Sequence, residues 1–277
     1  MNSAIVRGVP MEWDRTGTGP DLLLLHSLLT DLTVFEPMLP RLAARWRVTR
    51  VNLPGYGGSP PIEARAVAEH ADHVAAAMDV LELPHSTALF GNGFGGFVAL
   101  ETAIRHGGRF DALLIADALA AFPEPARVPF RAMAERVESQ GMQAVLDTAI
   151  GRMFPPGFAA AHPAQVAERK TALARADAGA FARACRALAA LDLRSQLRLI
   201  ANPTLVTVGA LDATTPPEHA EALARGIPGA VFRTIPDCGH CPMLEQPDLL
   251  AAAIEAFSDQ LRSAAPKNPR SSSTKAS

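Results

Sequence analysis

The chain has 277 residues, a mass of 29.3 kDa and a formal net charge of −2 at pH 7. Hydrophobic residues make up 48% of it and charged residues 19%, which is enough apolar material for a large buried core and too little charge for a disordered protein. Because the charge is nearly balanced, no strongly basic face is implied and we expect no binding of nucleic acid.

The sequence indicates neither a membrane-spanning nor an exported protein. Its apolar runs are short: Leu22–Leu25, for example, ends at His26, far below the roughly 18 residues that a membrane helix needs. The N-terminus lacks the apolar core of a signal peptide. Three cysteines are an odd number, which argues against a disulfide scaffold and favours a reducing compartment. We therefore expect a cytoplasmic globular protein, and the sequence leaves open whether it forms a homo-oligomer.

Short apolar runs alternate with longer amphipathic stretches along most of the chain. The predicted strands are Ala4–Val9, Leu22–Leu25, Val48–Asn52, Thr87–Phe90, Ala112–Ala116, Thr204–Val208 and Val231–Ile235. The predicted helices are Leu32–Trp46, Ala64–Leu81, Phe94–His106, Pro217–Arg225 and Pro247–Leu261. This alternation predicts an α/β fold with a mostly parallel, twisted sheet flanked by helices, and a ligand site at the C-terminal edge of the strands.

One segment, 123–191, interrupts the alternation because it contains no convincing strand. It is rich in Ala and Arg, and it is typical of several helices broken at Gly141, at Pro155–Gly157 and at His162–Pro163. A helical insertion between two strands predicts a cap over the edge of the sheet.

The core of the fold would then consist of 1–122 and 192–264, and 265–277 has the composition of a disordered tail. Most apolar residues of the cap are expected to pack the cap onto the core. A few are candidates for lining a pocket for a small-molecule substrate. The candidates are Met133, Met142 and Phe154 from the cap and Met243 from the core.

The most informative stretch is Gly91-Asn92-Gly93-Phe94-Gly95-Gly96, which reads as a strand end, a tight turn and a helix start. Small residues at 91, 95 and 96 let the helix begin close to the strand, which puts residue 93 at the apex of a strained turn. The pattern resembles the nucleophile elbow of the α/β-hydrolase superfamily, G-x-Nu-x-G-G, with Gly93 at the nucleophile position. It also matches G-x-G-x-x-G by letter, but it lies deep in the chain and its flanks fit the elbow better, so no cofactor is expected.

Four further segments resemble the same superfamily. His26-Ser27-Leu28 resembles the H-G-x loop, with Ser27 in place of the usual glycine, and the turn from Asn52 to Ser59 resembles D-x-x-G-x-G-x-S, with Asn52 in place of Asp. Asp212 follows a strand, and His240 lies in a loop 28 residues later, which leaves room for one helix and one strand. The order 93, 212, 240 is the superfamily's order of nucleophile, acid and histidine. The resemblance covers about residues 4–262 and is nearest to the enol-lactonase, C–C hydrolase and small-ester esterase branch.

The resemblance implies a role for each of these residues. His240 would be the general base, and Asp212 would hold its ring and favour the imidazolium form. The N–H groups of Leu28 and Phe94 would form an oxyanion hole, which needs no side chain at residue 93. Asp212 could instead cap the following helix, in which case Asp117, after the strand Ala112–Ala116, is the alternative acid. His26 is expected to be structural.

Other histidines and the cysteines carry no site in this interpretation. Cys238, His240 and Cys241 are crowded into four residues without a second ligand pair elsewhere, so no metal is expected. A cysteine as substitute nucleophile is a weak alternative. The remaining histidines are expected at the surface or at helix ends: His70, His73, His85, His106, His162 and His219.

Gly93 leaves three interpretations open because glycine cannot form an acyl-enzyme. The residue could be an inactivating substitution for serine, or it could be native in an enzyme whose His240–Asp212 dyad works without a covalent step. In the second case the resemblance also allows a cofactor-independent lyase or oxygenase, in which the dyad activates water or takes a proton directly from the substrate. Either way the substrate would be a small, largely apolar carbonyl compound, namely an ester, a lactone or a compound with a scissile C–C bond. The third interpretation is a catalytically inactive protein that binds a ligand or a partner on the hydrolase scaffold.

Overall fold

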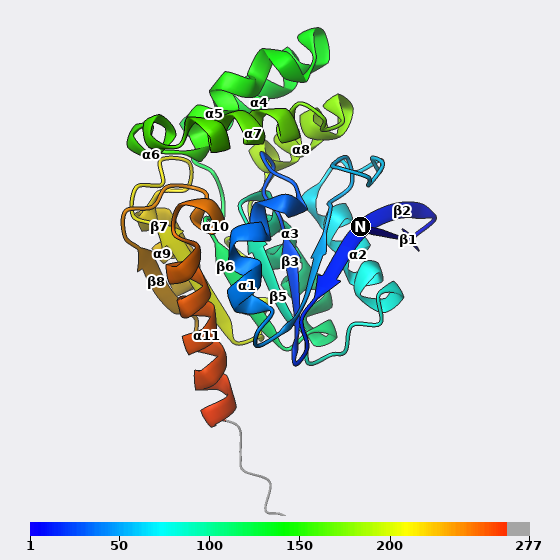
Figure 1. Cartoon of the computed structure of the whole chain (residues 1–277), viewed down its shortest axis with the longest axis vertical. Coiled ribbons are helices and arrows are strands. Elements are labelled where there is room, and N and C mark those ends of the chain that lie inside the picture. Colours follow the sequence, from blue (N-terminus) through cyan, green and yellow to red (C-terminus); the bar gives the residue numbers. More distant parts are fainter. Residues whose placement is uncertain (265–277) are drawn as a thin grey trace, which may run out of the picture.

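The apolar runs of the sequence form an eight-stranded sheet in the computed structural model, which describes residues 1–264 (Figure 1). The strands are β1 (Asn2–Val6), β2 (Val9–Thr16), β3 (Asp21–Leu25), β4 (Arg47–Val51), β5 (Ala88–Asn92), β6 (Ala112–Ala116), β7 (Thr204–Gly209) and β8 (Val231–Ile235). Their order in the sheet is β1-β2-β4-β3-β5-β6-β7-β8. All pairs from β4 to β8 are parallel, whereas β2 is antiparallel to both of its neighbours. The predicted mostly parallel α/β fold is confirmed.

Helices cover both faces of the sheet, so its central strands are apolar and buried on both sides. The strands β3, β6 and β7 are buried along their whole length. On one face α2 packs against α3, and α1 and α11 lie on the other (Figure 1). The helices of these layers and of the adjoining loops are η1 (Leu32–Met38), α1 (Leu39–Leu42), α2 (Val67–Val80), α3 (Phe94–His106), η2 (Gly107–Arg109), η4 (Leu197–Leu199), α9 (Pro217–Gly226), α10 (Pro242–Glu245) and α11 (Pro247–Ala264).

Two predicted elements near the N-terminus are wrong. The predicted strand Ala4–Val9 is instead a hairpin, because the chain reverses at Arg7 and Gly8, which both have positive φ, and β2 pairs back on β1. The predicted helix Leu32–Trp46 is reduced to the 3-10 turn η1 and the single turn α1. Pro37 lies inside η1 and a second proline lies at the start of α1, and each lacks the N–H that a continuous helix would need.

The segment between β6 and β7 is helical and lies over the C-terminal edge of the sheet (Figure 1). It contains α4 (Glu124–Gln140), η3 (Met142–Val145), α5 (Leu146–Met153), α6 (Pro156–Ala161), α7 (Pro163–Leu173) and α8 (Ala178–Ala190). We call these helices the cap. Its helices end and begin near the residues that the sequence marked: α4 ends before Gly141, at φ 78°, and α6 and α7 each begin at a proline. The predicted tail, 265–277, lies outside the described residues.

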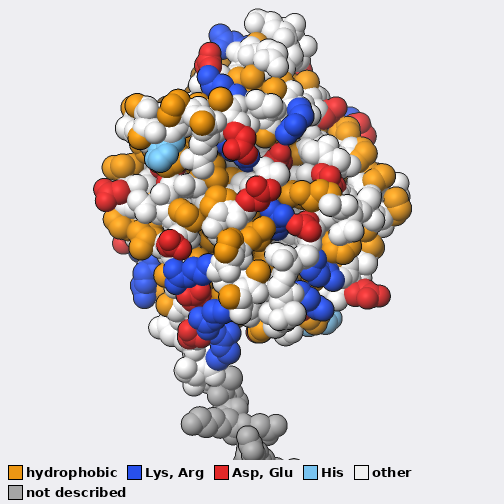
Figure 2. Space-filling view, in the orientation of Figure 1, with side chains coloured by type: hydrophobic (Ala, Val, Ile, Leu, Met, Phe, Trp, Pro, Cys, Tyr) orange, Lys and Arg blue, Asp and Glu red, His pale blue; other side chains and the backbone are white. Residues whose placement is uncertain are grey.

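The surface carries both signs of charge. On the face shown in Figure 2, acidic and basic side chains are interspersed among hydrophobic ones. Within residues 1–264, every helix is too short or too polar to cross a lipid bilayer.

Candidate active site

The turn between β5 and α3 is a tight elbow at the C-terminal edge of the sheet. Its apex, Gly93, has φ 52° and ψ −118°, a conformation that favours glycine. A Cβ on Gly91 would collide with the backbone of Gly95, and a Cβ on Gly95 would collide with the backbone of Leu25 and His26. These glycines therefore let α3 begin directly against the strand ends, and they hold the apex of the turn at the edge of the sheet.

His240 and Asp212 meet above this elbow. Asp212 follows β7 and His240 follows β8, and neighbouring parallel strands bring both loops to the same edge. His240 Nδ1 lies 2.8 Å from Asp212 Oδ2, and both side chains are buried. The other ring nitrogen, Nε2, lies 3.0 Å from the place where a Cβ on Gly93 would be. With Nδ1 bound to the carboxylate, Nε2 faces the elbow.

The carboxylate of Asp212 is held in its ionised form. Its Oδ1 accepts hydrogen bonds from the N–H groups of Thr214 and Thr215, at 2.7 and 3.0 Å, and its Oδ2 accepts one from the Thr215 hydroxyl at 2.5 Å. Burial alone would raise the pKa of Asp212, but the charge and hydrogen bond of His240, together with the bonds from Thr215, outweigh burial and hold this pKa at about 2. A fixed negative charge beside Nδ1 stabilises an imidazolium on His240.

Asp117, the alternative acid, lies beside this pair but makes no hydrogen bond to the histidine among the described residues. It directly follows β6, at φ 53°, and its two oxygens accept hydrogen bonds from Gly209 N (2.9 Å) and Asn92 Nδ2 (2.8 Å). Burial and the neighbouring charge of Asp212 raise the pKa of Asp117 well above its usual range. Asp117, Asp212 and His240 each have one atom that could bind a metal ion, and these three atoms lie within 4.8 Å of one another. All these carboxylate oxygens have protein donors, so the donor set is committed to hydrogen bonds rather than to an ion.

Two backbone N–H groups are available at the predicted oxyanion hole. Leu28 and Phe94 line the same cavity as Gly93 and His240, and within residues 1–264 neither N–H has a hydrogen-bond partner. The two loops that carry them are tied together, because Gly95 N donates to His26 O at 3.0 Å. Both N–H groups can therefore bind one carbonyl oxygen of a ligand.

Ser27 is a site residue that the sequence analysis did not assign. A Cβ built on Gly93 would overlap the hydroxyl oxygen of Ser27, so this hydroxyl fills the space that a nucleophile's side chain would take. The sequence held a signal for it, since Ser27 stands where the H-G-x loop has glycine. Its significance depends on the distance between two loops, which the sequence does not give.

Three further histidines have defined places. The ring of His26 bridges two loops, with Nδ1 donating to Ser27 O (2.8 Å) and Nε2 accepting from Leu53 N (3.0 Å), and burial lowers its pKa to about 4. His70 and His73 were expected at the surface or at helix ends, which is wrong. Both are buried on α2, where burial lowers their pKa values to about 4, and His70 packs edge-on against Phe94.

The cavity at the elbow is small. Its volume is about 20 Å³, close to the space of one water molecule. Met133 lines it, together with Phe122, Phe130 and Arg152. The other three candidate pocket residues are buried outside its described lining, namely Met142, Phe154 and Met243. Apolar cap side chains therefore fill most of the space above His240.

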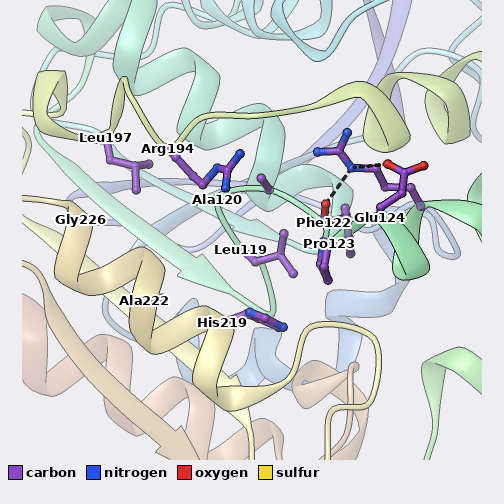
Figure 3. A pocket seen from close by; sticks show the side chains of 12 residues that line it. Leu119, Ala120, Phe122, Pro123, Glu124, Arg194, Leu197, His219, Ala222 and Gly226 are labelled. Atoms are coloured by element: carbon purple, nitrogen blue, oxygen red, sulfur yellow. Dashed lines mark hydrogen bonds and ion pairs between the residues drawn. The ribbon is translucent and has the colours of Figure 1, made fainter.

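A larger cavity of about 580 Å³ adjoins the small one, and Phe122 borders both (Figure 3). Figure 3 shows Glu124, Arg194 and His219 around the larger space, at the junction of the cap with α9. Phe122 therefore lies between the large outer cavity and the small space at the elbow.

Cys238 and Cys241 flank His240 in sequence but lie outside the described lining of the cavity. Both are buried, and burial raises the pKa of each thiol. A raised pKa leaves little thiolate, which argues against either cysteine as a substitute nucleophile.

The chain resembles known proteins over most of its length. The model of the family described as "Alpha/beta hydrolase family" matches residues 22–253. The chain is 29% identical over 238 residues to 3-oxoadipate enol-lactonase 2 of Acinetobacter baylyi, covering 86% of this chain and 88% of the relative. It is 29% identical over 254 residues to the pimeloyl-[acyl-carrier protein] methyl ester esterase of Neisseria meningitidis serogroup B, covering 84% and 91%.

Solved structures agree with this resemblance. The enol-lactonase from Burkholderia xenovorans LB400 matches with a TM-score of 0.87 at 25% identity, over 93% of this chain and 100% of that one. A thermophilic esterase from Thermogutta terrifontis matches with a TM-score of 0.86 at 29% identity, over 94% and 98%.

Proposed function

The chain belongs to the alpha/beta hydrolase family, and from this premise we propose that it hydrolyses a small ester or lactone through the pair His240–Asp212. The relatives named above are lactonases and esterases, which supports this class of substrate. The observation that carries the proposal is the position of His240 Nε2, aimed at the apex of the elbow while Nδ1 is held by a buried carboxylate.

The chemistry follows from these positions. His240 Nε2 accepts a proton from an attacking hydroxyl group, and Asp212 stabilises the resulting imidazolium. The N–H groups of Leu28 and Phe94 stabilise the negative oxygen of the tetrahedral intermediate. The imidazolium then gives its proton to the leaving oxygen. Because Gly93 has no side chain, the attacking hydroxyl comes from another group.

The small size of the cavity limits the substrate. A space of about 20 Å³ holds no ester, so the side chains of Phe122, Phe130 and Met133 must move when a substrate binds. These side chains are apolar, which favours a compound whose body is apolar around the reacting carbonyl.

A non-catalytic binding protein is the second candidate. The absence of a side chain on Gly93 favours it, because loss of a nucleophile costs an ordinary serine hydrolase about 10⁶-fold in turnover. This candidate predicts saturable binding of a ligand, no turnover of any ester or lactone, and binding that is unaffected by Asp212→Asn.

The two candidates are separated by restoring a side chain at the apex. Gly93→Ser and the matched control Gly93→Ala are compared with the parent on a panel of aryl esters and lactones. In both variants the new Cβ displaces the Ser27 hydroxyl, but only Gly93→Ser brings a hydroxyl of its own. We expect turnover by the parent, higher turnover by Gly93→Ser and a loss with Gly93→Ala. If the parent and a folded Gly93→Ser variant both stay inert on the whole panel, the hydrolase is excluded.

A further inference from the structure

Two atoms of the protein converge on the space that Gly93 leaves empty. Ser27 Oγ lies closer to a Cβ at that position than van der Waals contact allows, and His240 Nε2 lies 3.0 Å from the same point. A nucleophilic side chain on residue 93 would place its oxygen in this space. The hydroxyl of Ser27 therefore stands near the base where a nucleophile is needed.

The surroundings of Ser27 suit a reacting group. The residue is 3% exposed and lines the small cavity. Its backbone is fixed, since Ser27 N donates to Thr30 Oγ1 and Ser27 O accepts from Thr30 N, at 3.1 and 3.3 Å. Its hydroxyl, by contrast, makes no hydrogen bond within the described part of the chain. A hydroxyl without a protein partner can bond to a bound substrate, and catalytic hydrogen bonds often tighten only when substrate binds.

We propose that Ser27 is the nucleophile of this enzyme. Ser27 would take over the role that the residue at position 93 has in a standard elbow. The proposal rests on the hydrolase function proposed above. The relation to the oxyanion hole is preserved: the N–H that follows the nucleophile in sequence is now that of Leu28, and Phe94 provides the second.

The bonds and protons balance as in ester hydrolysis by a serine. His240 Nε2 takes the proton of Ser27 Oγ as Oγ bonds to the carbonyl carbon, and the oxyanion forms at Leu28 and Phe94. The bond to the leaving oxygen breaks, and the imidazolium protonates that oxygen. Water then attacks the acyl-serine, His240 takes its proton, and the same proton returns to Ser27 as the acid leaves.

A serine-directed alkyl fluorophosphonate tests the proposal, because it forms a stable bond to an activated serine oxygen. We expect one phosphonyl group on the parent protein, placed on Ser27 by peptide mass spectrometry. The label should disappear in Ser27→Ala and fall at least about tenfold in rate in His240→Ala, which removes the base. Ser139→Ala makes the same change on the exposed face of α4 and should label like the parent.

A parent protein without label on Ser27 overturns the proposal, whatever its turnover. If such a parent still hydrolyses esters, and Ser27→Ala does so within about threefold, water attacks directly and the hydrolase function stands. If the parent and Gly93→Ser are both unlabelled and both inert on the panel, the proposed function fails as well.

A separate observation concerns Arg152, at the end of α5. It lines the same small cavity, and its guanidinium carbon lies 4.9 Å above the ring of Phe130. Within residues 1–264, none of the ion pairs and none of the side-chain hydrogen bonds involves this guanidinium. Arg50 and Arg169, which are buried more deeply, do have carboxylate partners, Asp14 and Glu168 respectively. Arg152 itself is half-buried, and burial lowers its pKa.

We infer that Arg152 binds a carboxylate on the substrate, which makes the preferred substrate an ester or lactone that carries a second, ionised carboxyl group. A half-buried guanidinium without a carboxylate partner is well placed to bind an anion, and guanidinium pairs with carboxylate through two parallel hydrogen bonds. The reacting carbonyl would lie at Leu28 and Phe94, and the carboxylate would lie at Arg152 in the same cavity.

Binding without turnover tests this inference independently of catalysis. The dissociation constants of monomethyl glutarate and its neutral analogue dimethyl glutarate are measured by calorimetry on His240→Ala protein. We expect Arg152→Met to raise the dissociation constant of monomethyl glutarate about tenfold to a hundredfold, and that of dimethyl glutarate less than about twofold. The control Arg136→Met, which changes an exposed arginine of α4, should change neither dissociation constant. Equal affinities for monomethyl glutarate with and without Arg152, or no binding of it at all, would overturn the inference.

Discussion

Two loops at the C-terminal edge of the sheet differ in the side chain that each brings to the candidate site. The loop after β5 keeps the backbone of an elbow, with Gly93 at φ 52°, but has no side chain at its apex. The loop after β3 has a hydroxyl, on Ser27, that points into the space left by that missing side chain. The comparison teaches that flanking glycines and strand ends set the shape of an elbow without a side chain at its apex; in our proposal the reacting group comes from the neighbouring loop.

The largest expected effect on kcat concerns Asp212, the carboxylate that holds His240. Asp212→Asn removes the charge beside His240 Nδ1 and favours the wrong ring tautomer, so kcat should fall about 10⁴-fold. The change is measured as kcat on the best ester of the panel. Asp192→Asn, on the surface, should leave kcat unchanged. A fall below about tenfold would mean that the dyad is not part of the reaction.

The next effect tests whether glycines set the elbow. In Gly95→Ala the new Cβ would press on the backbone of Leu25 and His26, so we expect a loss of about 3 kcal/mol or more in the free energy of unfolding. Gly151→Ala is the matched control, because that glycine lies in α5 with open space around it and should gain about 0.5–1 kcal/mol. Chemical denaturation measures both, and similar values for the two variants would contradict this account of the elbow.

The smallest effect concerns the buried carboxyl beside the dyad. Because its pKa is raised in the folded protein, Asp117 contributes stability that is fully present below its unfolded pKa of about 4 and is lost as pH rises through the folded value. Asp117→Asn removes this loss. Unfolding by urea at pH 4, 6 and 8 should therefore show stability falling less with pH in Asp117→Asn than in the parent. Asp111→Asn, which is exposed, should keep the parent's slope.

The sequence predicted most of the sheet and the helix after the elbow. Apolar runs such as Ala112–Ala116 and Val231–Ile235 match their strands, and Phe94–His106 matches α3, because local pattern and burial agree there. The family resemblance ordered residues 93, 212 and 240, and the structure places the two side chains over the apex. The hairpin at Arg7–Gly8 was missed because nothing in that short run separates one strand from two.

What the sequence could not predict depends on contacts between distant segments. The burial of His70 depends on its packing against Phe94 from another helix. The proposed role of Ser27 depends on the distance between two loops, and the small size of the cavity depends on how side chains such as Phe122 and Phe130 pack together, with ring centroids 4.7 Å apart. Local patterns carry none of these distances.

In the proposed reaction, His240 is the general base that hydrolysis requires. The most direct measurement is the rate at which parent and His240→Ala protein hydrolyse the best ester or lactone of the panel, with His85→Ala, an exposed histidine, as the control. We expect the parent and His85→Ala to turn over alike and His240→Ala to lose at least about 10⁴-fold in kcat. Equal rates for the parent and His240→Ala would contradict it.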